Sequence, residues 1–148
     1  MKKLINLLLC LFLMSGKAAA EVEENPKLTT KESTRVLADK FMSSLQTSEI
    51  NESFKIIRSY MPIPDLEFAN MTAKTEENLL YIEPRFGKLL GYELLKEDTI
   101  KEYMIRYIYV QKYEQHLLRW FFVFYKAQDE WLINVFYWDD KAQDMFDL

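Results

Sequence analysis

Residues 118–126, with the sequence LRWFFVFYK, restrict the fold of this chain more than any other segment. Aromatic and β-branched side chains favour a β-strand, in which successive side chains point to opposite faces. One face would carry Leu118, Trp120, Phe122 and Phe124, and the other Arg119, Phe121, Val123 and Tyr125. A strand with one face in water alternates apolar and polar residues, and this one does not. Both faces of the sheet therefore have to be covered, the first by helices and the second by another part of the chain, a ligand or another subunit.

Three further strands are predicted around this segment, at residues 92–96, 103–113 and 131–138. Their connections are short, which favours an antiparallel meander. The last three predicted strands are longer than the usual ~5–6 residues, which indicates a strongly curved sheet. No glycine or proline follows Gly91, so we expect the bend to come from bulges in non-glycine backbone.

Three helices are predicted before the strands. Thr29 and Glu32 fit a capping box that starts the first helix, which carries apolar residues at helical spacing. The second helix is predicted over residues 50–60, ahead of two prolines. The third is predicted from Asp65 to about residue 82, ending before Pro84. The expected fold is therefore α+β, with three N-terminal helices packed on a strongly curved four-stranded antiparallel meander.

The N-terminus has the composition of a secretory signal peptide. Lys2 and Lys3 precede an apolar run over residues 4–14, and three alanines end at Ala20. We therefore expect a signal peptide over residues 1–20, a charged mobile leader over 21–28 and a single domain over 29–148. The protein would then be periplasmic or secreted, and no segment of the mature chain is apolar enough to span a membrane.

Cys10 raises the alternative of a lipoprotein, but the residues before it are leucines rather than the small residue that lipoprotein processing requires. After cleavage the mature chain contains no cysteine, so packing rather than disulfides must stabilise it. Removal of three lysines leaves 16 basic residues against 23 acidic ones, a net charge of −7. This balance argues against nucleic acid or an anionic membrane as partner.

The order of helices followed by a curved meander resembles the NTF2-like (cystatin-like cone) superfamily, in which a bent sheet wraps a helical layer around a cavity. The last third also resembles uncharacterised secreted bacterial members with a W-x-F-x-F-Y-K…W…F…D pattern. The matching positions are Trp120, Phe122, Phe124, Tyr125, Lys126, Trp131, Phe136 and Asp139. The resemblance implies the fold and not a function, because this cone hosts isomerases, dehydratases, carriers and inert scaffolds. No catalytic motif of the superfamily can be matched.

The sequence offers no recognisable catalytic or metal-binding motif. His116 is the only histidine and no cysteine remains, which excludes the usual zinc sites. Phosphate-binding glycine loops are absent. The carboxylates over residues 139–147 lack the spacing of a calcium loop, and a solvated turn is favoured there. We therefore expect no catalytic residue, no metal and no cofactor.

The preferred function is a non-enzymatic binding or interaction module with an aromatic-lined cavity or sheet face. The candidate residues for a small apolar ligand are Tyr107, Tyr109, Trp120, Phe122 and Arg106. Simple core packing, and a salt bridge for Arg106, are the structural alternatives. Phe121, Val123 and Tyr125 are the candidates for a homodimer or partner interface. The alternative function is a small isomerase- or dehydratase-like enzyme with a pocket carboxylate facing a tyrosine, and a filled cone would indicate a scaffold.

Overall fold

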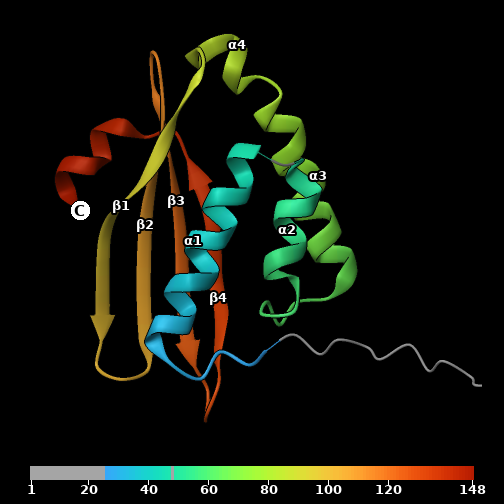
Figure 1. Cartoon of the computed structure of the whole chain (residues 1–148), viewed down its shortest axis with the longest axis vertical. Helices are drawn as coiled ribbons and strands as arrows, with labels where there is room; N and C mark the ends of the chain where they lie inside the picture. The colour runs from blue at the N-terminus through green and yellow to red at the C-terminus, as the bar shows by residue number, and fades with distance from the viewer. Residues whose placement is uncertain (1–25, 48) are drawn as a thin grey trace, which may run out of the picture.

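The computed structural model describes residues 26–47 and 49–148, so the predicted signal peptide and Cys10 lie outside the described residues. Helices come first and strands second, which confirms the α+β class (Figure 1). The order is α1 (Lys31–Thr47), α2 (Ile50–Arg58), α3 (Asp65–Leu79), α4 (Ile82–Phe86), β1 (Leu89–Ile100), β2 (Met104–Tyr113), β3 (Leu117–Lys126), β4 (Trp131–Asp139) and a 3-10 helix, η1 (Ala142–Asp147). No helix among the described residues is long and apolar enough to cross a membrane.

The four strands form one antiparallel sheet in the order β1-β2-β3-β4, which confirms the predicted meander. The last three strands begin and end within one residue of their predicted bounds. β1 is much longer than predicted, because its charged second half pairs with β2 instead of forming a loop. Asp98 lies opposite Arg106 and Glu97 opposite Tyr107 in this ladder.

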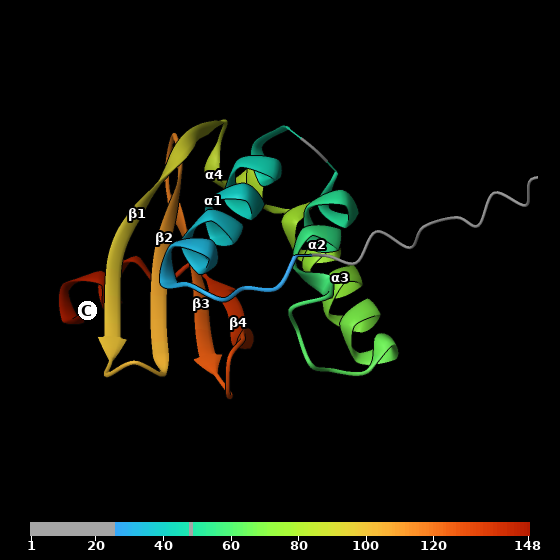
Figure 2. The same cartoon turned by 60° about the horizontal axis from the view of Figure 1, so that its bottom comes forward.

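β-Bulges interrupt both outer strands of the sheet. The pairing of β1 with β2 skips Leu90 and Leu95, and the pairing of β3 with β4 skips Asn134. Each bulge adds an unpaired residue and increases the local twist. β1 bends in its first half (Figure 2). This half contains Gly91, which has φ 140°, so a glycine does lie inside a strand, contrary to the expected bounds.

α1 lies against one face of the sheet, and α2 and α3 stand beside it on the β4 side (Figures 1 and 2). Thr30, rather than Thr29, caps α1. The backbone N–H of Ser33 donates to Thr30 Oγ1 at 3.1 Å, and the Thr30 N–H donates to Ser33 Oγ at 3.2 Å. The predicted pairing of Thr29 with Glu32 is therefore wrong by one residue. Ser33, in place of the glutamate, accepts the hydrogen bond from the N-cap backbone.

The helix predicted from Asp65 to about residue 82 ends at Leu79, and a separate α4 follows, so the described residues contain four α-helices before the sheet instead of the three predicted. Pro84 lies within α4 and not after it. This proline is in the first turn, where an N–H has no intrahelical acceptor and its absence costs little. α4 ends at Phe86 and Gly87 caps it, with φ 81°, a backbone conformation that glycine adopts without strain.

The core is aromatic and centres on Phe41 of α1. Its ring makes edge-to-face contacts with Phe54 of α2, Trp120 and Phe122 of β3 and Phe136 of β4, at centroid distances of 5.3 to 5.7 Å. Such pairs are worth ~0.5–1.5 kcal/mol each beyond the apolar area they bury. The face of β3 that was expected under the helices is thus inside the core.

The N-terminal part of the described chain is packed against the domain. Leu28 is buried, and its carbonyl accepts a hydrogen bond of 2.8 Å from the Trp131 N–H. The Tyr60 hydroxyl donates to the Pro26 carbonyl at 2.9 Å, and Lys27 forms an ion pair with Glu130. The packed part of the chain therefore begins before residue 29, where the domain was expected to start.

Candidate functional site

Four of the five candidate ligand residues lie in the closed core. Tyr107, Tyr109, Trp120 and Phe122 are at most 1% exposed. Their rings pack on neighbouring aromatic rings, as in the Tyr109–Phe122 pair at 5.8 Å. A ligand could reach them only if α1 left the sheet.

The hydroxyls of the two buried tyrosines join the sheet to α1. Tyr109 donates to Asp39 Oδ1 at 2.7 Å, and the Tyr107 hydroxyl lies 3.0 Å from Thr34 Oγ1. Burial raises the pKa of both phenols, and the Asp39 carboxylate raises that of Tyr109 further. Both therefore stay protonated at neutral pH, where they hold α1 in place.

Arg106, the fifth candidate, lies on the opposite face of the sheet, which we call the outer face. Its Nε and Nη2 donate to Asp98 Oδ2 at 2.9 and 2.5 Å. These hydrogen bonds hold the pKa of Asp98 below its ordinary value. The salt bridge that the sequence offered as the structural alternative for Arg106 is therefore present.

The outer face carries an apolar surface that we call the outer patch. The outer patch consists of apolar residues that are neighbours across the strands: Ile100, Met104, Val123, Tyr125, Leu132, Val135 and Tyr137. Four of them, Ile100, Tyr125, Val135 and Tyr137, are between 39 and 53% exposed. A hollow of about 380 Å³ opens at its edge, lined by Asp98, Ile100, Met104, Ile105, Arg106 and Val123. Two of the three candidate interface residues, Val123 and Tyr125, belong to this patch.

Phe121, the third interface candidate, is 3% exposed and belongs to the covered half of the same face. Its ring stacks on Tyr137 at 4.3 Å, and the guanidinium of Arg119 lies 5.1 Å from its centroid. η1 crosses this half of the sheet, on the side away from α1 (Figures 1 and 2). The chain therefore covers part of its second sheet face with its own C-terminal residues, which is one of the covers that the sequence left open, although a solvated turn was favoured there.

An ion pair fastens η1 to the sheet. Arg119, which is 4% exposed, donates from Nε and Nη2 to the two carboxylate oxygens of Asp139 at 2.7 and 2.8 Å. Its Nη2 also reaches Asp144 of η1 at 3.4 Å. Burial alone would raise the pKa of Asp139, but the hydrogen bonds from Arg119 and the Lys141 N–H hold it below its ordinary value.

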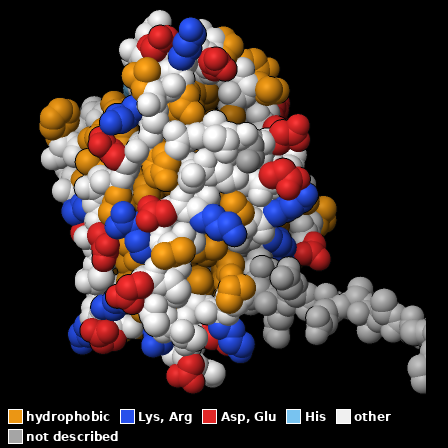
Figure 3. All heavy atoms as spheres, in the orientation of Figure 1, with side chains coloured by type: hydrophobic (Ala, Val, Ile, Leu, Met, Phe, Trp, Pro, Cys, Tyr) orange, Lys and Arg blue, Asp and Glu red, His pale blue; other side chains and the backbone are white. Residues whose placement is uncertain are grey.

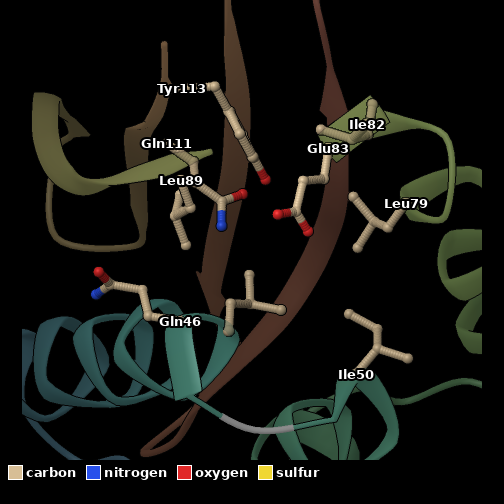
Figure 4. Close-up of a pocket in the computed structure, with 9 residues that line it drawn as sticks. Gln46, Ile50, Leu79, Ile82, Glu83, Leu89, Gln111 and Tyr113 are labelled. Atoms are coloured by element: carbon tan, nitrogen blue, oxygen red, sulfur yellow. The ribbon is translucent and has the colours of Figure 1, made fainter. Parts of the chain in front are cut away.

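A second pocket opens on the helix side, between the end of α1, the α3–α4 junction and the sheet (Figure 4). Its volume is about 360 Å³, and its lining is Leu45, Gln46, Ile50, Leu79, Ile82, Glu83, Leu89, Gln111 and Tyr113. We call it the α4 pocket. The Glu83 carboxylate and the Tyr113 hydroxyl turn toward each other across it. Burial and the charge of Glu83 raise the pKa of Tyr113 to about 12.

Tyr113 lies on the same face of β2 as the two buried tyrosines, but the sequence analysis did not single out Gln111 or Glu83. A signal for Gln111 existed, because it is the one amide on the otherwise apolar and aromatic inner face of β2. Glu83 had no such signal, since the predicted helix ended before Pro84. Its place in the pocket depends on the turn that separates α3 from α4.

Acidic and basic side chains are interspersed over the face that carries α1, and this face shows no continuous basic patch (Figure 3). Within residues 26–47 and 49–148 no three His, Cys, Asp or Glu side chains are grouped closely enough to hold a metal ion.

Comparison with protein-family models, curated proteins and solved structures gives no match to this chain.

Proposed function

We propose that this protein is a non-enzymatic interaction module that binds a protein partner through the outer patch. The observation that supports this function is the contiguous group of exposed aliphatic and aromatic side chains on one sheet face. Single exposed apolar residues are ordinary, but a joined patch on a folded domain marks an interaction surface. A hollow beside the patch gives the surface a shape into which a partner's side chain can fit.

The partner that fits this surface best is a second copy of the chain. Charged residues are confined to its edge, where Asp98 and Arg106 are of opposite sign. Two copies related by a twofold axis could set each arginine near the other copy's aspartate. Full burial of a large apolar side chain is worth ~1.5–3 kcal/mol, so a half-exposed one gains ~1 kcal/mol. Several of these together support a weak to moderate dimer.

The NTF2-like cone and the periplasmic or secreted location belong to the same proposal. Four helices ahead of a bulged meander support the cone. The basic and apolar N-terminus of the sequence supports export. A module that folds without cysteine is also suited to an oxidising compartment.

An isomerase- or dehydratase-like function has one feature in its favour, the Glu83 and Tyr113 pair in the α4 pocket. A phenol with a pKa of about 12 keeps its proton at neutral pH, however, and Glu83 is exposed to water. General acid–base catalysis is most effective with groups that titrate near the working pH. The pair is therefore better suited to hydrogen bonding with a ligand than to proton transfer.

Sedimentation of the purified mature chain tests the interaction module. We expect the wild type to form dimers as its concentration rises, and Tyr125→Glu to remain a folded monomer. Tyr81→Glu is the matched control, because Tyr81 is exposed but lies outside the outer patch. A wild type that stays monomeric at high micromolar concentration, or a Tyr81→Glu variant as impaired as Tyr125→Glu, would contradict the proposal.

A further inference from the structure

We infer that the α4 pocket binds a small amine with an apolar body and a carbonyl oxygen, as in the amide of an apolar amino acid. The pocket lies on the helix side of the sheet, so this site is separate from the outer patch. It rests on different residues and on a different observation.

The deciding group is the side-chain amide of Gln111, which is only 3% exposed. An indole N–H can only donate, so the 2.9 Å hydrogen bond from Trp120 Nε1 must end on Gln111 Oε1. This contact fixes the orientation of the amide, and its Nε2 points toward the end of α1, on one side of the pocket (Figure 4). Nε2 has no hydrogen-bond partner among the described residues.

A buried donor without a partner is costly, and the structure avoids that cost through the pocket. Among the described residues, no fully buried side-chain nitrogen or oxygen lacks a partner. Gln111 Nε2 must therefore touch solvent, and the pocket that it lines provides the access. A ligand that displaces this water must offer an acceptor to the amide, or it leaves the donor unsatisfied.

The other polar groups of the pocket define the rest of the ligand. The Tyr113 hydroxyl, held protonated, is a second donor near Gln111 and suits the same carbonyl oxygen. Glu83 is the one charged residue in the lining and it is acidic, so it favours an ammonium group and disfavours an anion. Aliphatic side chains such as Leu45, Ile50 and Leu79 form the remaining wall and match a branched aliphatic body.

Leucinamide has all three features and serves as the first probe. N-Acetylleucinamide keeps the carbonyl and the side chain without the ammonium, and N-acetylleucine carries a carboxylate. We expect leucinamide to cause saturable shifts in the amide NMR spectrum of residues around the pocket. N-Acetylleucinamide should bind at least about fivefold more weakly, and N-acetylleucine should not bind.

Three variants test the roles of individual residues. Gln111→Met keeps a weak acceptor for the Trp120 indole but removes the donor. Leucinamide and N-acetylleucinamide should therefore each bind about tenfold more weakly. Glu83→Gln should weaken leucinamide at least about fivefold and leave N-acetylleucinamide unchanged. Leu79→Trp should fill the pocket and abolish binding, and Leu66→Trp on the exposed side of α3 is its matched control.

The inference is wrong if leucinamide causes no saturable shifts in the wild type, or if Leu79→Trp binds it as well as Leu66→Trp does. It is also wrong if N-acetylleucine binds more tightly than leucinamide, because the pocket would then favour an anion. The Leu79→Trp variant should sediment like the wild type. Failure here is thus distinguishable from failure of the proposed interaction module.

Discussion

Replacing Asp139 by asparagine should destabilise this protein far more than the same change at Asp98. Both aspartates accept two hydrogen bonds from an arginine on the outer face, but their surroundings differ. Arg119 is 4% exposed, whereas the Arg106 side chain is 42% exposed. Loss of one partner from a buried ion pair leaves an uncompensated charge and costs ~3–5 kcal/mol. Loss of an exposed pair costs ~0–1 kcal/mol.

Asp144 sets where in that range Asp139→Asn should fall. Its carboxylate is 3.4 Å from Arg119 Nη2 and keeps some opposite charge beside the guanidinium. We therefore expect a loss near the lower limit, about 3 kcal/mol, against less than about 1 kcal/mol for Asp98→Asn. Urea unfolding at neutral pH measures both, as a shift of the midpoint at an unchanged slope. Equal losses in the two variants would refute the assignment of a buried ion pair.

The same ion pair gives a pH dependence with a definite sign. The pKa of the Asp139 carboxyl in the folded protein lies below its ordinary value of 3.8. A group of this kind stabilises the fold fully above its unfolded pKa and loses that contribution as the pH falls through its folded pKa. The stability gap between wild type and Asp139→Asn should therefore be widest at neutral pH and shrink below about pH 4. A gap that stays constant or widens in acid would contradict this account.

Two further pairs of variants test local features of the backbone. Gly87→Ala should cost ~1–3 kcal/mol, because Gly87 has φ 81° and a Cβ there would meet Glu114 Oε2 at 2.6 Å. Gly91→Ala should lower the melting temperature less than Gly87→Ala does, because a Cβ at Gly91 would meet nothing within 4 Å. Thr30→Ala should cost ~1 kcal/mol through loss of the α1 cap, while Thr29→Ala should leave the melting temperature unchanged. A larger loss of stability at Thr29 than at Thr30 would show that Thr29 caps α1, as predicted from the sequence.

The sheet was predictable because side-chain alternation in a strand depends only on local geometry. Trp120 and Phe122 point to the same face in any strand that contains them, and the short loops leave little choice but a meander. The second half of β1 was not predictable in this way. The predicted strand ended at residue 96, whereas in the structure Asp98 pairs with Arg106 of β2, a partner that depends on the fold and not on the neighbouring sequence.

The α4 pocket and the cover of the outer face were harder to predict, for a related reason. α4 depends on whether Pro84 falls before a helix or within its first turn, a difference that the sequence pattern does not resolve. η1 has no buried residue, and the contact of its Asp144 with Arg119, at 3.4 Å, holds it on the sheet instead. An arginine inside an otherwise apolar strand, with an aspartate in register on the next strand, was a signal that could have been used.

The bulges in β1 and β4 also bear on how the edges of this sheet can meet other chains. An open sheet ends in two strands with unpaired N–H and C=O groups, and a straight edge of this kind can add strands from other chains without limit. Here the skipped residues Leu90, Leu95 and Asn134 twist both edges away from the flat geometry that stacking requires. The proposed pairing of two copies face to face does not use these edges, while open-ended growth along the sheet is hindered.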